Sequence, residues 1–266
     1  MLTTSTVDSG YDLRDYSITC SKELPQVYSC PVTVRVKNQG IQSTCVAHAA
    51  ASVVEYHYKS AHKIYKSFST EFIYGFRTFG YYIGDGMRIR DALKTLKNIG
   101  DCFKSDCSGN NSYKIAMSRV SSNVDKYKEL AYPYRISAYY RCKTTEEIKT
   151  ALIKHGPVLV SMNTYDGAKL VKDVYTYDST AKYGRHCVMI YGYDERGWLV
   201  QNSWGSLWGG DGRFVLPYKY KLNEAWGISD SITDDINVKR TDSRRDRLYK
   251  LFNKVINVLL KFVKKS

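Results

Sequence analysis

One cysteine in this chain stands where a thiolate would be stabilised. Cys45 follows a polar, glycine-containing loop at residues 39–44 and precedes a run of small apolar residues typical of a buried helix. A thiol in the first turn of a helix lies near unsatisfied N–H groups and the positive end of the helix dipole, and both favour the charged form. Because only the thiolate is a good nucleophile, Cys45 is a candidate catalytic residue.

A nucleophilic thiolate also needs a base and a group that orients the base. His186 opens an apolar stretch, and Asn202 follows sixteen residues later in a segment rich in Trp and Gly. This set predicts a cysteine hydrolase. Other readings stay open, since Cys45 among alanines is also typical of a core, and Asn202 could be a turn residue. Three further histidines compete for the role of base: His48, His57 and His62. His48 lies one turn along the Cys45 helix, but its side chain should point down the helix and not into a cleft.

Composition allows a substantial core in one domain or two lobes, since 43% of the 266 residues are hydrophobic. The formal net charge is +14, and the segment from Lys239 to Ser266 contains ten Lys or Arg against two Asp, which accounts for eight of these charges. The basic character therefore belongs mostly to the tail and says little about a substrate of the body. No apolar run of about eighteen residues occurs, so no membrane-spanning helix is predicted.

The seven cysteines leave two redox readings open. In a secreted protein all but one could pair and leave a catalytic thiol; in a reducing compartment all would be thiols, with Cys187 a small core residue. The N-terminus lacks the basic patch and apolar segment of a standard signal peptide. We therefore expect an intracellular or packaged protein, for example a virion-associated one.

The first half of the chain is predicted to be mainly helical. A short alternating strand at residues 31–36 should lead to the Cys45 helix, which should run to about Lys59. Ser69 can cap a second helix through about Thr78. Residues 88–98 repeat apolar side chains at helical spacing and end before a glycine.

The second half is predicted to be rich in strands. A loop at residues 107–122 comes first, and then a capping box at Thr144 and Glu147 begins a helix that a Gly-Pro pair at residues 156–157 ends. Four short, β-branched segments follow: residues 158–162, 187–193, 197–201 and 213–216. A helical half followed by a stranded half indicates an α+β fold of two lobes with the active site between them.

The last segment, from about residue 240, has apolar residues at helical spacing and Lys or Asn on the opposite face. This pattern predicts a basic amphipathic helix. Such a helix could pack on its own body, or it could bind an anionic membrane surface, a nucleic acid or a protein partner.

Several motifs in order resemble the papain-like (C1) cysteine peptidases. They are Lys-Asn-Gln-Gly at residues 37–40, the nucleophile at Cys45, His-Cys-Val-Met-Ile-Tyr-Gly-Tyr from His186, and Asn-Ser-Trp-Gly-x-x-Trp-Gly-x-x-Gly at residues 202–212. The resemblance covers roughly residues 31–230, includes the interval from His to Asn, and is closer to compact bacterial and viral members than to lysosomal ones. It implies a papain-like fold with a helical N-terminal lobe and a β-rich C-terminal lobe.

The resemblance also assigns roles. Cys45 would attack the scissile carbonyl as a thiolate paired with protonated His186, which would then give its proton to the leaving amine. Asn202 would orient His186. The side-chain amide of Gln39 and the backbone N–H of Cys45 would form the oxyanion hole, where the loss of one donor costs about 10²–10³-fold in rate.

Substrate binding is implied for three residues by the same resemblance: Trp204, Gly86 and Met87. Trp204 would in addition shield the His–Asn hydrogen bond from water, and residues 224–226 are further candidates for lining an apolar specificity pocket. Peptide hydrolysis of this type uses no cofactor and no metal.

The sequence departs from the family in two places near the nucleophile. Gln42 stands where the family has a disulfide-forming cysteine, and Val46 stands where it has an aromatic residue. No long inhibitory prosegment precedes the strand at residues 31–36. We therefore expect residues 1–30 to form a short extension that lies partly across the cleft and controls it.

These observations predict three parts: an extension at 1–30, a peptidase domain at 31–236 with lobes at about 40–130 and 131–236, and a basic helix at 237–266. The predicted function is that of an endopeptidase acting on extended polypeptide. Two alternatives remain, namely acyl transfer or ligation through the same thioester, and a catalytically silent papain-fold binding protein. The second is disfavoured because Gln39, Cys45, His186 and Asn202 are all present.

Overall fold

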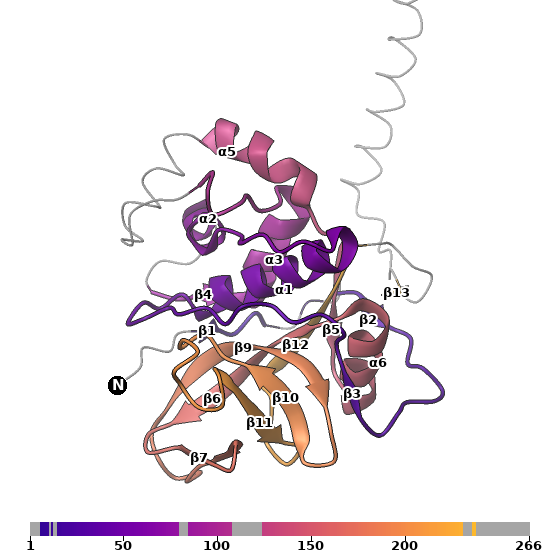
Figure 1. Cartoon of the computed structure of the whole chain (residues 1–266), viewed down its shortest axis with the longest axis vertical. Coiled ribbons are helices and arrows are strands. Elements are labelled where there is room, and N and C mark those ends of the chain that lie inside the picture. Colours follow the sequence, from indigo (N-terminus) through magenta and orange to yellow (C-terminus); the bar gives the residue numbers. More distant parts are fainter. Residues whose placement is uncertain are drawn as a thin grey trace, which may run out of the picture.

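The computed structural model describes residues 6–10, 12, 15–79, 85–107, 124–230 and 236–237. Most of its helices gather on one side of the molecule, above a large sheet (Figure 1), whereas α6 lies apart, beside β5 (Ala138–Cys142). The helical elements are α1 (Cys45–His62), α2 (Thr70–Gly75), the 3-10 turn η1 (Phe76–Phe79), α3 (Ile89–Asn98), α5 (Val124–Ala131), η2 (Tyr132–Tyr134) and α6 (Thr145–His155).

The helix boundaries follow local signals. The Ser69 hydroxyl accepts a hydrogen bond from the N–H of Phe72, and that of Thr144 accepts one from Glu147, so both predicted N-caps are confirmed. Gly156 ends α6 with a φ of 101°, a backbone conformation that favours glycine. Helix α1 runs to His62, three residues beyond the predicted end.

The β-rich lobe is one mixed sheet in the order β5–β12–β6–β9–β10–β11–β8–β7, with β3 added to β9. Its strands are β3 (Tyr28–Ser29), β5 (Ala138–Cys142), β6 (Val158–Tyr165), β7 (Lys169–Val171), β8 (Val174–Thr176), β9 (Tyr183–Tyr193), β10 (Gly197–Gln201), β11 (Arg213–Pro217) and β12 (Glu224–Ser229). Strand β9 begins four residues before the predicted start, so His186 lies inside the strand, opposite Met162 of β6.

Two short pairings involve the N-terminal residues. Strand β1 (Thr6–Val7) pairs in parallel with β4 (Met87–Arg88) of the helical lobe, and β2 (Ser17–Ile18) pairs with β13 (Ile236–Asn237). The N-terminal residues therefore reach both lobes of the fold.

The predicted strand at residues 31–36 is wrong. The segment carries no strand assignment, and side chains bind several of its carbonyls in place of a neighbouring strand. Lys59 donates to the carbonyl of Thr33, and Arg213 donates to that of Val34. Alternating side chains indicated an extended backbone, but its carbonyls accept hydrogen bonds from long polar side chains of α1 and β11 and not from a neighbouring strand.

The two lobes share one core. Helix α1 packs against β9, so the segment that begins with Cys45 lies against the strand that carries His186. The first twelve residues of α1 are all buried, and most of them are small, which allows close approach to the sheet. This contact sets the distance between the two predicted catalytic side chains.

A buried glutamate ties the nucleophile loop to α1. Glu55 is fully buried and forms an ion pair with Lys37, two residues before Gln39. Its carboxylate also accepts hydrogen bonds from the side chains of Tyr65 and Ser67 and from the Phe68 N–H. The charge is therefore compensated on all sides, as a buried carboxylate requires.

We expect Glu55→Ala to lower the free energy of unfolding by about 3–5 kcal/mol, because it leaves the Lys37 ammonium buried without its partner. Urea unfolding of the two proteins measures this difference. Glu146→Ala, on the exposed side of α6, is the control and should change stability by less than about 0.5 kcal/mol. A loss below about 1 kcal/mol for Glu55→Ala would mean that the network does not hold the loop.

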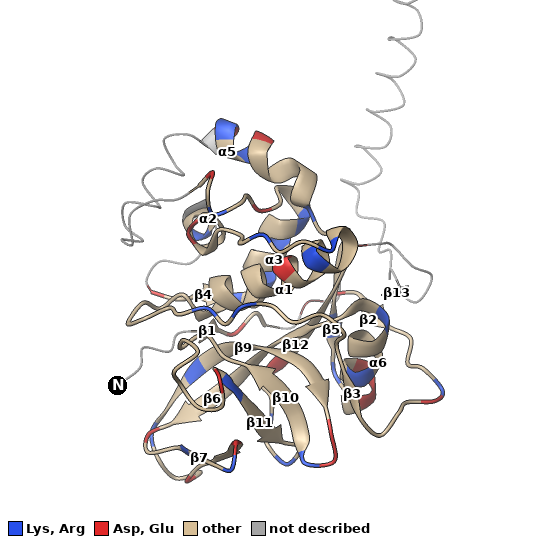
Figure 2. Ribbon diagram, in the orientation of Figure 1, with Lys and Arg blue, Asp and Glu red and all other residues tan. Residues whose placement is uncertain are grey.

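Charged residues of both signs are interspersed over the described body in the view of Figure 2. No helix among the described residues is long and apolar enough to cross a membrane.

Cys102 and Cys107 form a disulfide, and the other five cysteines are free. The structure therefore matches neither prediction, that all cysteines but one are paired or that all are free thiols. The predicted loop at 107–122 and the predicted basic helix fall almost entirely outside the described residues.

Candidate active site

Cys45 is the first residue of α1 and is fully buried. Burial raises the pKa of its thiol, but the His186 imidazole, the Thr6 hydroxyl and a backbone hydrogen bond with Cys187 outweigh burial and lower the pKa to about 7. The Thr6 Oγ1 lies 3.3 Å from the sulfur. A substantial thiolate fraction at neutral pH follows from this arrangement.

His186 and Asn202 form a hydrogen-bonded pair. Nε2 of His186 lies 2.8 Å from Oδ1 of Asn202, and since the amide oxygen can only accept, Nε2 carries the hydrogen. The other ring nitrogen, Nδ1, is buried and is not used by Asn202, and the imidazole interacts with the Cys45 thiol. This tautomer leaves Nδ1 as the atom that can exchange a proton with the Cys45 sulfur.

Two segments far apart in the sequence make a seam beside this pair. The N–H of Gln39 donates to the carbonyl of Ser203, and that of Gly205 donates to Lys37. Gly205 has a φ of 85°, and a Cβ there would lie 3.1 Å from the amide of Asn38. The glycine of the Asn-Ser-Trp-Gly motif thus allows the two segments to approach closely.

The Gln39 side chain is buried and oriented at both ends. Its Oε1 accepts a hydrogen bond of 2.6 Å from the Ser203 hydroxyl, and its Nε2 donates one of 2.8 Å to the carbonyl of Gln42. The sequence offered no signal for the role of Ser203, which holds the amide in this orientation.

Trp204 stacks on His186 with 4.7 Å between ring centroids and 23° between planes. Trp208 meets Trp204 edge-on at 4.9 Å. The indole covers one face of the imidazole and limits the access of water to it.

The competing histidines lie elsewhere. His48 is buried with Nδ1 2.9 Å from the carbonyl of Thr44, and burial lowers its pKa to about 3. The His57 side chain is one-tenth exposed and pairs with Asp230, and desolvation lowers its pKa as well. His62 is the last residue of α1, and its ring contacts the Tyr58 ring at a tilt. None of them is near Asn202 in the way His186 is.

The other predicted substrate-binding residues lie on the helical lobe, away from Trp204. The N–H of Gly86 bonds to the Tyr74 hydroxyl, and Met87 is buried beside Thr6 in the β1–β4 pair. Within residues 224–226, Trp226 is fully buried beneath the guanidinium groups of Arg90 and Arg141, so its ring does not line an open pocket.

We call the described residues 6–10, 12 and 15–18 the N-terminal strap. Arg90 of α3 binds this strap. It donates hydrogen bonds to the carbonyls of Ser9 and Gly10 and forms a bidentate ion pair with Asp15. Arg141 of β5 adds a bond to the Gly10 carbonyl. Because the Arg90 and Asp15 side chains are each at most one-tenth exposed, this pair is shielded from solvent. The strap holds Thr6 against the nucleophile. The sequence led us to expect an extension across the cleft, but not these particular contacts.

A sequence profile of the papain family cysteine proteases matches residues 26–233. This chain belongs to the papain family of cysteine proteases.

Relatives within this family include viral proteins. An uncharacterised peptidase C1-like protein of Acanthamoeba polyphaga mimivirus is 25% identical over 251 residues, which cover 80% of this chain and 75% of that protein. The viral cathepsin of Adoxophyes honmai nucleopolyhedrovirus is 26% identical over 217 residues, covering 79% of this chain. The match spans only 61% of that cathepsin's length.

Solved structures agree with the family on the fold. Xylellain, a cysteine protease from Xylella fastidiosa, superposes with a TM-score of 0.74 at 24% identity, covering 85% of this chain and 96% of that one. Procathepsin L 3 from Tenebrio molitor larval midgut superposes at 0.63 with 18% identity, covering 81% and 74%. The predicted α+β, papain-like fold, the resemblance to compact bacterial and viral members, and the assignment as a thiol protease are therefore confirmed.

For this papain-family chain, alkylation of Cys45 by iodoacetamide should accelerate as pH rises, with a midpoint near pH 7, because only the thiolate reacts. In His186→Ala the midpoint should move upward, since the main group that lowers the thiol pKa is gone while burial still raises it. Peptide mass mapping separates Cys45 from exposed Cys20. An unchanged midpoint in His186→Ala would contradict this account of the thiol.

Proposed function

We propose that this chain is an endopeptidase that cleaves extended polypeptide through a thioester at Cys45. The supporting observation is the lowered pKa of Cys45 beside a His186 whose Nε2 is held by Asn202 at 2.8 Å. Of all the ionisable pairs in the described residues, this one joins a nucleophile, a base and an orienting amide in one place.

The reaction follows from these positions. The Cys45 thiolate attacks the scissile carbonyl carbon, and the carbonyl electrons move to its oxygen. As that oxygen returns its electron pair, the C–N bond breaks and His186 gives a proton from Nδ1 to the departing amine. His186 then takes a proton from water, whose oxygen attacks the thioester and releases the acid and the thiolate.

The negative oxygen formed in both steps needs donors. In this proposal the Cys45 N–H at the start of α1 supplies one, and the side-chain amide of Gln39 supplies the other. The Ser203 and Gln42 contacts keep that amide in place before substrate arrives, so that no reorganisation is needed during the reaction.

Digestion of an unfolded protein in water enriched in heavy oxygen tests this proposal. Hydrolysis puts one heavy oxygen into each new carboxyl terminus, and pretreatment with a thiol-protease inhibitor should block cleavage. Acyl transfer to an amine would instead give new peptide or isopeptide bonds without heavy oxygen, and would replace hydrolysis as the function. Intact polypeptide at all enzyme concentrations would support the silent binding protein.

We also propose that residues 1–30 act as an inhibitory segment of the peptidase domain at 31–236. The position of Thr6 against the sulfur and the burial of both Thr6 and Ser9 support this division of the chain. The binding of an anionic membrane, a nucleic acid or a protein through residues 237–266 stays a prediction, because all but residue 237 of that segment lie outside the described residues.

A further inference from the structure

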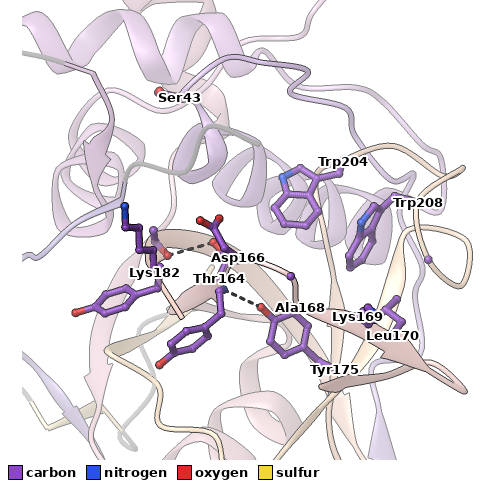
Figure 3. Close-up of a pocket in the computed structure, with 15 residues that line it drawn as sticks. Ser43, Thr164, Asp166, Ala168, Lys169, Leu170, Tyr175, Lys182, Trp204 and Trp208 are labelled. Carbon is purple, nitrogen blue, oxygen red and sulfur yellow. Dashed lines mark hydrogen bonds between the residues drawn. The ribbon is translucent and has the colours of Figure 1, made fainter. Parts of the chain in front are cut away.

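A large pocket lies beside the candidate active site. Its volume is about 900 Å³, within the range of binding pockets for small ligands. It extends from Trp204 and Trp208 across to residues of β6, β7 and β9 and the connections between them (Figure 3). At its rim is Ser43, two residues before Cys45. No residue of the N-terminal strap lines it, so the pocket is open while the strap is in place.

The position of the pocket assigns it to the leaving-group side of the proposed reaction. The departing amine must lie within reach of His186, and the pocket begins at the indole stacked on that imidazole. Gly86 and Met87 do not line it, and Met87 pairs with Thr6 of the strap instead. A peptide whose scissile bond lies at Cys45 therefore extends its C-terminal half towards the pocket.

The walls of the pocket are aromatic. The two indoles form one side, and three tyrosines contribute to the other: Tyr165, Tyr175 and Tyr183. The Tyr175 hydroxyl accepts the N–H of Tyr165 at 3.2 Å, which fixes that ring and satisfies its polar end. Such walls favour a flat apolar side chain, since aromatic pairs add to the gain from burial.

The rim is basic. Lys169 and Lys182 are exposed at the pocket, and Asp166 is its one acidic lining residue among those described. Arg185, next to His186, pairs with Asp8 of the strap at 3.3 Å. An acidic side chain of the strap thus already pairs with a cation on β9, next to His186.

We propose that this leaving-group pocket selects substrates with an aromatic residue followed by a carboxylate residue on the C-terminal side of the scissile bond. This proposal rests on the proposed peptidase function and names the substrate class for it. Lys182 and the indole of Trp208 determine the specificity: the ammonium attracts the carboxylate, and the indole packs on the aromatic ring.

Four quenched fluorescent peptides test the selection. They share one N-terminal half and carry Phe-Glu, Phe-Lys, Gly-Glu or Gly-Lys after the scissile bond, each prepared in three registers. The enzyme is the full chain, with active sites titrated by an epoxysuccinyl inhibitor. We expect kcat/KM to fall about tenfold or more from Phe to Gly in the best register, and about threefold to tenfold from Glu to Lys.

Two charge-reversal variants separate the effect of a charge at the pocket from the effect of the protein's net charge. Lys182→Glu should remove or invert the preference for Glu, whereas Lys126→Glu, an equally exposed change on α5 of the helical lobe, should keep it. Trp208→Ala should reduce the preference for Phe and retain that for Glu. The Glu preference should also weaken at high salt, because the lysines are exposed.

The outcomes are distinct. If Cys45 is titrated and all four peptides are cleaved equally in every register, the pocket does not select this class, and the peptidase proposal stands. Equal loss of the Glu preference in both charge reversals would assign it to net charge and overturn the role of Lys182. If Cys45 is not titrated and no peptide is cleaved, the proposed function fails and this proposal fails with it.

Discussion

Cys45→Ala is expected to abolish peptide hydrolysis, with a loss of about 10⁴-fold or more in kcat, because no other group in the site can form the thioester. Covalent capture by an epoxysuccinyl thiol-protease inhibitor should disappear with it. Intact mass measured after incubation reports this directly, with one adduct on the wild-type chain and none on the variant.

Cys20→Ala is the matched control for this result. Cys20 is an exposed free thiol. Partial desolvation and the neighbouring carboxylates of Glu147 and Glu146 raise its pKa, so it should react slowly. The Cys20→Ala chain should therefore still take one adduct. An adduct that survives in Cys45→Ala and vanishes in Cys20→Ala would assign the reactive thiol to the surface and remove the basis of the proposed mechanism.

Deletion of residues 1–10 is expected to raise the second-order rate constant for inactivation of Cys45 by about tenfold or more. Thr6 contacts the sulfur and β1 pairs with β4, so an inhibitor reaches the thiol only when these contacts open. The observed rate scales with the open fraction, and about 1.4 kcal/mol of strap binding corresponds to a factor of ten. Labelling quenched at a series of times and followed by mass spectrometry measures the inactivation rate of the full chain and that of the deletion variant.

Asp8→Asn provides the control for the deletion. It removes only an ion pair between half-exposed side chains, which is worth little, so the rate should change less than about threefold. Urea unfolding of both variants checks that each remains folded. Equal inactivation rates and equal peptide turnover with and without residues 1–10 would show that the strap does not control the site.

In the proposed inhibition, the strap occupies the cleft in which substrate would bind. It uses backbone carbonyls of Ser9 and Gly10, and these are groups that any polypeptide offers to Arg90 and Arg141. The leaving-group pocket is separate from these contacts, since no strap residue lines it.

Local and short-range features could be read from the sequence. The caps at Ser69 and Thr144 and the strand at residues 197–201 depend on neighbours a few positions away, and the structure has them as predicted. The helix predicted at residues 88–98 is also present and begins one residue later, at Ile89. The order and spacing of the motifs around Cys45, His186 and Asn202 sufficed to indicate the family, because the chemistry restricts those residue types.

Contacts between distant segments could not be read in this way. The extended segment at 31–36 has the alternation of a strand, yet its partners are side chains from α1 and β11. The single disulfide between Cys102 and Cys107 also depends on where the chain places each thiol, and residue types alone left it undetermined.

The sequence by itself thus determined the two-lobed α+β class, the family and the candidate nucleophile, base and orienting amide. Only the tertiary structure decided that Thr6 rests on the sulfur, that Ser203 orients Gln39, and that tyrosines from separate strands face Trp204 across a pocket. The physical reason is that propensities and spacings act within a few residues, whereas these contacts join residues that become neighbours only when the lobes pack and the sheet forms.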